Sequence, residues 1–309
     1  MYDKTDLRST LTTAAPAASA APDASKPFGT ASCVHFKQGP ADDSDALCRK
    51  WYGRGHNFVI CYVEAKAGAK ITRAAQPDEF VILSPQHGTG LHVRSDHGSA
   101  DIPGYSVVIV PAGASTIEVK SDGHFFILYT TRSRDLAAKA ANAAAYEAPR
   151  HHVAPLVPWP DPLGGPKIRR YSMEVANEPG RFGRIWRCTT FMVNLFVETA
   201  PRDIEKVSPH YHDDFEQGSL LMSGTMSHHI RWPWTTNMRN WLPDEHMDCS
   251  SPSIAVIPPP AIHTSNGTGP ELRLLVDVFC PPRVDFSQKP GWVLNADEYP
   301  MPAQQPVAA

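Results

Sequence analysis

Four side chains in the second half of the chain have the types and spacing of a metal site. His210 and His212 lie two residues apart, so both point to the same face of a β-strand, and Glu216 keeps that parity if the strand is unbroken. His263 lies further along the chain and must come from another strand. Neutral imidazoles and one carboxylate suit a divalent transition metal and leave coordination positions open for water, substrate or dioxygen. The sequence therefore predicts that these four residues bind one metal ion per chain.

The spacing of these residues resembles the two motifs of the cupin superfamily. His210-x-His212-x3-Glu216-x7-Gly224 is similar to the first motif, although its gap before the glycine is one residue longer than is common in the family. Pro258-x-Pro260-x2-His263-x2-Asn266 is similar to the second motif, with a proline where glycine is common. The resemblance covers the segment from Ile168 to Pro282. It implies a small antiparallel β-barrel with the metal inside its mouth.

Part of this pattern is repeated in the first half of the chain. The run from Ser106 to Gly113 matches the run from Ser253 to Pro260, and both are β-branched strands that enter a proline turn. In the first copy, Thr116 takes the place of His263, and the segment Ala75–Phe80 contains no histidine and keeps only Glu79. The resemblance implies an all-β protein of two tandem cupin barrels (double-stranded β-helix, jelly-roll), of which only the second binds metal.

Composition divides the chain of 309 residues into four parts. Residues 1–28 are rich in Ala, Ser, Thr and Pro and are expected to form a disordered tail. Residues 29–133 are assigned to the degenerate N-terminal barrel. Residues 134–166 are expected to form a short helix, from Arg134 to Tyr146, and a proline-rich linker. Residues 167–309 are assigned to the metal-binding C-terminal barrel.

Charge and composition argue against several classes of partner. A net charge of −3 and a pI near 6.5 give no reason to expect nucleic acid or an anionic membrane. No apolar run approaches the length of a membrane span, and the first residues lack the hydrophobic segment of a secretory signal. The six cysteines show no paired spacing and are expected to be reduced. We therefore expect a cytoplasmic homo-oligomer that acts on a small molecule.

Polar residues near the metal motifs are the candidates for catalysis. Arg187, or else Arg231, is expected to bind a substrate carboxylate in a bidentate manner. Gln217 directly follows the predicted metal carboxylate and is expected at the barrel mouth. His228 and His229 are neighbours on one strand, so one of them should point into the barrel, where it is a candidate acid or base.

Three functions fit these residues. The first, common among cupins with three His and one Glu, is a mononuclear Fe(II) dioxygenase acting on a small aromatic or unsaturated acid. The second is a non-redox lyase, isomerase or hydrolase, in which Zn(II), Mn(II) or Ni(II) polarises a carbonyl or activates water. Cu(II) is a further metal that such ligands bind. The third is a small-molecule binding bicupin without catalysis. No dedicated acid–base pair stands out, and the aromatic insertion that begins at Trp232 is expected to exclude water from the mouth. Both points favour the dioxygenase, with Fe(II) as the preferred metal.

Overall fold

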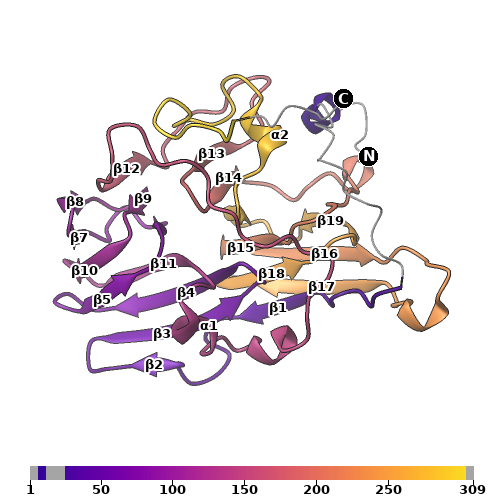
Figure 1. Cartoon of the computed structure of the whole chain (residues 1–309), viewed down its shortest axis with the longest axis horizontal. Helices are drawn as coiled ribbons and strands as arrows, with labels where there is room; N and C mark the ends of the chain where they lie inside the picture. The colour runs from indigo at the N-terminus through magenta and orange to yellow at the C-terminus, as the bar shows by residue number, and fades with distance from the viewer. Residues whose placement is uncertain (1–5, 12–24, 304–309) are drawn as a thin grey trace.

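The computed structural model describes residues 6–11 and 25–303, and nearly all of its regular structure is antiparallel β-strand (Figure 1). In the N-terminal half, the larger of two sheets has seven strands in the order β12 (Arg169–Ser172), β9 (Ser106–Val110), β6 (Phe80–Ser84), β11 (Gly123–Thr130), β4 (Phe58–Ala65), β3 (Cys48–Arg54) and β2 (Asp43–Ser44). The smaller has four strands in the order β5 (Lys70–Gln76), β10 (Gly113–Val119), β7 (Leu91–Ser95) and β8 (Gly98–Ile102).

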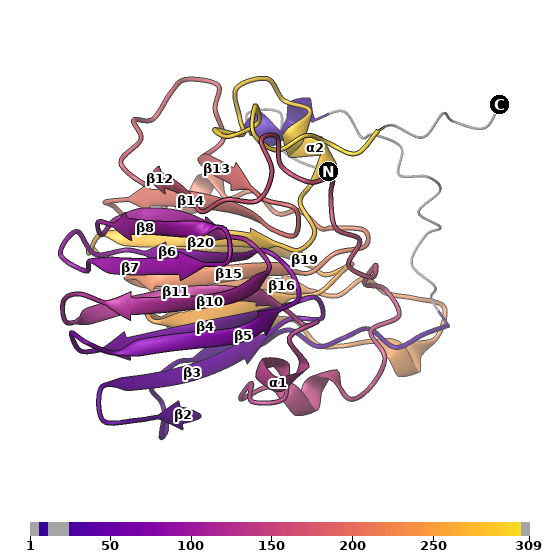
Figure 2. The same cartoon turned by 60° about the vertical axis from the view of Figure 1, so that its left-hand side comes forward.

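The C-terminal half repeats this arrangement of a large and a small sheet (Figure 2). Its larger sheet has six strands in the order β1 (Ser32–His35), β18 (Ser253–Ile257), β15 (Gln217–Ser223), β20 (Arg273–Phe279), β14 (Met192–Glu198) and β13 (Arg184–Arg187). Its smaller sheet has three strands in the order β17 (Glu245–Ser250), β16 (Thr225–Arg231) and β19 (Ile262–Gly267). The architecture confirms the prediction of an all-β fold with two barrels.

The two halves exchange one strand each. β1, which comes from the start of the chain, pairs with β18 through Cys33 opposite Ala255. β12, which follows the linker, pairs with β9 through Arg169 opposite Ile109. In Figure 1, indigo β1 lies among the orange strands and magenta β12 lies beside the purple ones. Strand pairing therefore does not follow the boundaries at residues 29 and 167 that composition suggests.

The two large sheets share a hydrophobic core, and strand β4 shows how. Its residues Phe58, Ile60 and Tyr62 pack into a cluster that also contains Leu220 and Val276 from the C-terminal half. The alternate side chains of β4 point the other way, into the interior of the N-terminal barrel. Each large sheet is thus buried on both faces, which explains why its strands are continuous apolar runs.

A fragment of residues 150–309 is therefore expected to aggregate or to unfold at a much lower temperature than the full chain. It lacks β1 and exposes the face that packs against the N-terminal large sheet. Size-exclusion chromatography and thermal unfolding of the fragment and the full chain measure this directly. A monodisperse fragment that unfolds cooperatively at the temperature of the full chain would contradict the shared core.

The expected helix between the barrels is much shorter than its alanine content suggests. α1 spans only Arg134–Ala137, and a single 3-10 turn, η2, spans Ala143–Tyr146. Between them, the Asn142 side chain accepts a hydrogen bond from Arg54 N at 2.9 Å and donates one to Arg54 O at 2.8 Å. Ala141 N also donates to Tyr52 O. These tertiary bonds to β3 replace the helical ones and override intrinsic propensity.

The other helices are single turns, namely η1 (Leu7–Thr10), η3 (Ile204–Lys206), η4 (Met238–Asn240) and α2 (Val284–Ser287). Within residues 6–11 and 25–303, no helix has the length and apolar character needed to cross a membrane.

Candidate metal centre

His210, His212 and His263 come together inside the C-terminal barrel, as the sequence predicts. His210 and His263 form an antiparallel bridge, with His210 N donating to His263 O at 3.0 Å and His263 N donating to His210 O at 2.7 Å. His212 follows two residues after His210. The three ring centroids are 4.3 to 5.1 Å apart, and one nitrogen from each ring lies within 4.8 Å of the others. All three side chains are buried.

Backbone carbonyls orient two of these rings. His210 Nδ1 lies 2.9 Å from Ser208 O, and His263 Nδ1 lies 3.0 Å from Ala261 O. A carbonyl only accepts, so each Nδ1 carries the proton and each Nε2 keeps a lone pair. Burial lowers the pKa of His263 to about 4 and the pKa of His210 well below its ordinary value. These imidazoles are therefore neutral at neutral pH, as metal binding requires.

The fourth donor at this centre is the Gln217 side chain. Gln217 Oε1 lies 2.9 Å from His212 Nε2 and 3.4 Å from His263 Nε2. Two ligand atoms about 2.1 Å from one ion, at a right angle, are about 3.0 Å apart, so this geometry fits a shared metal. Gln217 Nε2 donates to Asp277 Oδ1 at 3.1 Å, and Ser219 Oγ also donates to that oxygen at 3.1 Å. The buried Asp277 carboxylate thereby turns the amide oxygen of Gln217 toward the imidazoles.

Glu216, predicted as the fourth ligand, points away from this centre. Its carboxylate accepts hydrogen bonds from His56 N at 2.5 Å and from the Tyr146 hydroxyl at 3.4 Å. Residues 211–216 are not part of a strand, with a bend at residues 213–214, and β15 begins only at Gln217, so the strand parity counted from His210 is lost. This placement corrects the sequence expectation. Glu216 ties the C-terminal barrel to the N-terminal half, and Gln217 takes its place beside the histidines.

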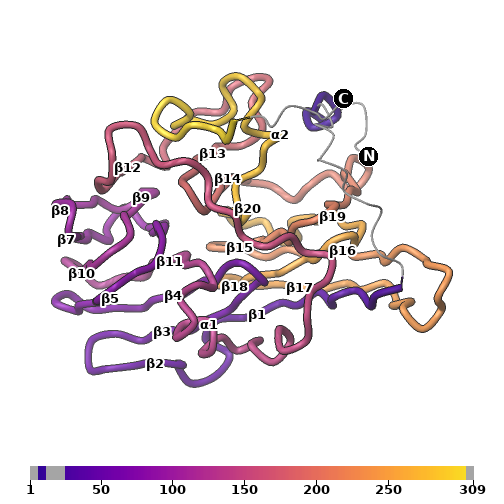
Figure 3. The backbone as a smooth tube through the Cα atoms, viewed as in Figure 1, coloured from indigo at the N-terminus to yellow at the C-terminus, as the bar shows by residue number. Residues whose placement is uncertain are grey.

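A segment from the start of the chain covers the centre. Residues 6–11, expected to belong to a disordered tail, contain η1, and Arg8 Nη1 lies 3.1 Å from His210 Nε2. Asp6 holds Arg8 through an ion pair at 2.8 Å and accepts a hydrogen bond from the Ser208 hydroxyl. The Arg8 guanidinium also lies over the Phe182 ring at 4.8 Å. Figure 3 shows this indigo turn near α2 and away from β1.

A cavity of about 340 Å³ opens beside the imidazoles. Its wall includes His210, His263 and Gln217, the guanidinium groups of Arg8 and Arg202, and the apolar side chains Phe182, Phe196, Met226 and Leu275. Nearby, the guanidinium of Arg283 contributes, after burial, to the lowered pKa of His212. A cavity with cations and aromatic rings at a candidate metal centre suits a small anionic ligand.

No protein-family model matches the sequence, and no curated protein matches it either. Solved structures match the fold. AerE from Microcystis aeruginosa aligns with 83% of this chain and 99% of its own length, at a TM-score of 0.53 and 7% identity. The oxalate decarboxylase of Lactobacillus farciminis, in complex with formate, aligns with 85% of this chain and 90% of its own, at 0.52 and 15% identity. The fold is that of a bicupin.

A third match, the Bacillus subtilis oxalate decarboxylase with its Mn(II) centres, covers 87% of this chain and 84% of its own length. Its TM-score is 0.51 and its identity is 11%. At these identities the likeness shows the bicupin fold alone. The chemistry of the present chain must be argued from its own residues.

Two of the candidate catalytic residues lie outside the centre of this bicupin. Arg187 is buried against the end of the chain, where its Nε donates to Tyr299 O at 3.1 Å, and it does not line the cavity. His229 points outward and pairs with His246, whose Nδ1 lies 2.7 Å from its own. His228, in contrast, points inward, with its Nδ1 2.7 Å from Ser265 Oγ. Burial lowers the pKa of His228 to about 3, so it is neutral and weakly basic.

The aromatic insertion does not form the expected cap. Trp232 is buried against Phe28, with ring centroids 6.0 Å apart, and Trp234 stacks on Trp241 at 4.7 Å while remaining 79% exposed. None of these residues lines the cavity wall within the described chain. Arg231, the second candidate for carboxylate binding, is exposed and pairs with Asp244 at 2.6 Å. The cover over the centre instead comes from residues 6–11.

The N-terminal barrel of the bicupin is filled by apolar side chains and carries no counterpart of the three-histidine centre in its described strands. Glu79, the one motif carboxylate left there, accepts hydrogen bonds from Thr189 N at 2.9 Å and the Tyr299 hydroxyl at 3.0 Å. It therefore connects the two halves. Thr116 lies on β10 in the position that His263 takes in the second barrel.

Three contributors to the centre were not predicted. Arg8 and Asp277 are far from the motifs in sequence, and the role of Gln217 as a donor depends on where β15 begins. The dipeptide Asp213-Asp214 is a turn signal that predicts the break in the strand. No comparable signal in the sequence marks Arg8.

Proposed function

We propose that this bicupin is a metal-dependent enzyme, a mononuclear Fe(II) dioxygenase that acts on a small aromatic or unsaturated carboxylic acid. One observation carries the proposal. Three imidazole nitrogens and the Gln217 amide oxygen converge beside a cavity whose wall includes His210, His263, Gln217 and the guanidinium groups of Arg8 and Arg202. His210, His212, His263 and Gln217 would hold Fe(II), which would supply the electrons that a reaction with dioxygen needs.

The charge of the donor set favours an anionic substrate. The three imidazoles and the Gln217 amide are all neutral donors, so they leave the double positive charge of a divalent ion uncompensated. Two carboxylates of the cavity wall have cationic partners, because Asp6 pairs with Arg8 at 2.8 Å and Glu198 with Arg273 at 2.7 Å, while Asp277 Oδ1 accepts hydrogen bonds from Gln217 and Ser219. A substrate carboxylate would therefore provide the compensating charge.

Arg8 is placed to orient such a substrate. The ion pair with Asp6 and the contact with Phe182 fix its guanidinium at the wall of the cavity. Arg8 Nη1 lies 3.1 Å from His210 Nε2, so the guanidinium is next to the position where the imidazoles would bind an ion and can attract an anion bound there. Residues 6–11 also cover the centre, and Phe182 and Phe196 give the cavity an apolar wall that excludes water.

Among the described residues of the cavity wall, Asp277 is the candidate acid or base, because burial raises its pKa to about 6. Asp277 holds the amide of Gln217, and the inward-facing imidazole of His228 is weakly basic. General acid–base catalysis works best with a group whose pKa is near the working pH and that is within reach of the substrate. A single carboxyl group that is already bonded to Gln217 and Ser219 does not make an acid–base pair, and electron transfer by a metal needs none, which supports the dioxygenase.

A non-redox reaction, such as loss of carbon dioxide from a small acid, is the second candidate. Structures of oxalate decarboxylases share the fold, and one of these proteins has Mn(II) centres. A divalent metal at the present centre would equally polarise a bound carboxylate or carbonyl. A binding protein without catalysis would use the same cavity. Dependence on dioxygen separates these alternatives.

The test is to measure the metal content of protein purified without added ions, and then oxygen uptake with hydroxybenzoates, catechols, aminophenols, β-diketones and unsaturated acids. Oxygen uptake is expected with Fe(II) and is expected to disappear with Zn(II), which has no redox chemistry. Full turnover under strict anaerobiosis, or with Zn(II), would instead establish the non-redox alternative. Retention of the acid without turnover under either condition would indicate a binding protein.

Replacing Arg8 by glutamine tests the carboxylate class. Loss of a charge-assisted hydrogen bond of about 1.5–3 kcal/mol is expected to lower kcat/KM for the acid by about 10- to 100-fold, mainly through KM. The matched control is Arg231→Gln, which removes an exposed arginine outside the cavity and should leave KM unchanged. A lower KM in the Arg8 variant would show that Arg8 blocks the cavity instead of binding substrate there.

A further inference from the structure

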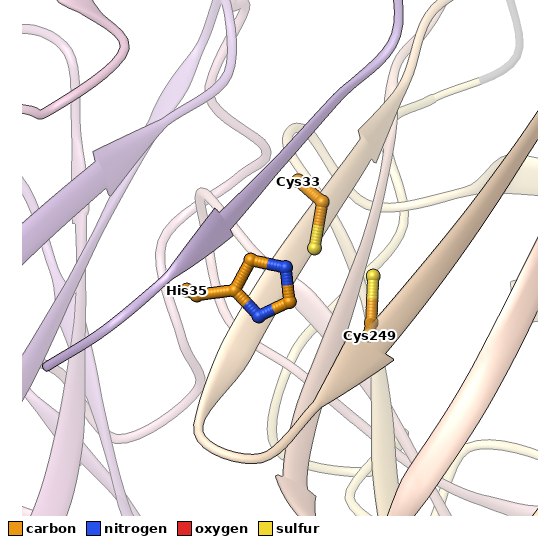
Figure 4. Close-up of side chains that lie close together, drawn as sticks. All are labelled: Cys33, His35 and Cys249. Carbon is orange, nitrogen blue, oxygen red and sulfur yellow. The ribbon is translucent and has the colours of Figure 1, made fainter. Parts of the chain in front are cut away.

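A second cluster of potential metal ligands lies outside the three-histidine centre. Cys33, His35 and Cys249 each place one ligand atom within 4.8 Å of the others. Figure 4 shows the two sulfur atoms directed toward each other, with the imidazole of His35 beside them. Both cysteines are free thiols. Nothing in the proposed reaction uses these residues.

The cluster lies at a seam of the C-terminal barrel. Cys33 and His35 are on β1, at the edge of the large sheet, and Cys249 is on β17, at the edge of the small sheet. Among the described strands, β1 and β17 do not pair through backbone hydrogen bonds, so only side chains can connect the large and the small sheet at this edge. Val34 points into the core between the two halves, whereas Cys33 packs with Cys249 and Met226 on the barrel side.

The chemistry of these groups matches a thiophilic cation. In a tetrahedral zinc site, Zn–S and Zn–N bonds of about 2.3 and 2.0 Å place ligand atoms about 3.5 to 3.8 Å apart, so a small contraction of the cluster suffices. Cys249 is 2% exposed, while Cys33 and His35 are partly exposed, so an ion can enter and keep a water as its fourth ligand.

We propose that Cys33, His35 and Cys249 form a second metal site, which binds Zn(II) and joins β1 to β17 across the seam of the C-terminal barrel. Binding of Zn(II) displaces the thiol protons of Cys33 and Cys249 to solvent and involves no change of oxidation state. Two thiolates neutralise the charge of the ion, in contrast to the neutral donors at the three-histidine centre. Softness separates the two sites, because thiolates select zinc-like ions and imidazoles accept a wider range of metals. The expected total is then two ions per chain, one at each site.

Titration of the full-length protein with Co(II), a coloured substitute for Zn(II), tests this proposal. A thiolate-to-cobalt charge-transfer band in the near ultraviolet is expected, and Zn(II) should abolish it. The band reports only sulfur ligands, so ions at the three-histidine centre do not contribute. It should be absent in Cys33→Ser and in Cys249→Ser, and His35→Ala should bind Co(II) at least about 10-fold more weakly. Cys48→Ser, which removes a buried thiol in the N-terminal barrel, is the matched control and should keep the band.

Alkylation of the wild-type protein provides a measurement that does not depend on whether a variant folds. Zn(II) is expected to slow the reaction of iodoacetamide with Cys33, as followed by mass spectrometry, at least about 10-fold. A wild-type protein without the charge-transfer band, or a band that persists in both serine variants, would overturn the proposal. So would a Cys33–Cys249 disulfide as the main form of protein purified without added oxidant, because a disulfide cannot bind the ion.

Discussion

His263→Ala is expected to remove the metal from the three-histidine centre and to abolish activity. The side chain supplies one of three converging nitrogens, it is buried, and backbone bonds to His210 and Ala261 hold it in place. Loss of groups that only orient metal ligands weakens affinity by about 10- to 100-fold, so loss of a ligand should exceed that range. Equilibrium dialysis with Fe(II) and elemental analysis measure the affinity and the stoichiometry, and oxygen uptake measures the activity.

His229→Ala is the matched control for this experiment. It also removes an imidazole from the C-terminal barrel, but from the outer face, where His229 contacts His246 and Asn266. Metal content and activity should be unchanged. The proposed cysteine site would add a second metal ion per chain to the measured stoichiometry. The His263→Ala and His229→Ala substitutions are therefore also made in the Cys33→Ser variant, in which only the three-histidine centre should bind metal. Retention of one equivalent in Cys33→Ser/His263→Ala would show that the imidazoles do not form the centre.

The parts of the structure that follow from local pattern were predictable from the sequence. The β-branched runs before proline turns mark β9 and β18, which occupy equivalent positions in the two large sheets. His210 and His212 share a face because of the two-residue period of a strand, and the proline turn places His263 on a neighbouring one. The loss of ligands in the first copy, visible at Thr116, also indicated which barrel carries the centre.

The features that were missed depend on contacts between distant segments. Glu216 and Gln217 exchange their expected roles because a bend precedes β15, and one residue of shift reverses every side chain. Arg187 is held by Tyr299, and this partner becomes adjacent only after the end of the chain has folded back. Arg8 reaches His210 from a segment whose composition resembles a disordered tail. Periodicity carries no information about such contacts.

The exchange of roles between Glu216 and Gln217 leads to a second prediction with a large effect. Glu216→Gln is expected to keep the metal and the activity, whereas Gln217→Leu, of similar size, is expected to lower metal affinity by at least about 10- to 100-fold. The reason is that Gln217 Oε1 lies 2.9 Å from His212 Nε2, while the Glu216 carboxylate accepts a hydrogen bond from His56 N. Metal affinity of both variants is measured by competition with a chromophoric chelator.

Thermal unfolding of the two variants separates metal binding from folding. Glu216→Gln should lower the unfolding temperature, because it weakens a buried contact between the two halves of the chain, and yet leave the centre intact. Asp277→Asn is expected to weaken metal binding by about 10-fold, which is less than Gln217→Leu. The asparagine side chain can still contact Gln217, but it can also donate hydrogen bonds and therefore no longer fixes the orientation of the Gln217 amide as a carboxylate does. If Glu216→Gln loses the metal and Gln217→Leu retains it, the ligand set is three histidines and a glutamate, and the strand in solution continues unbroken from His210.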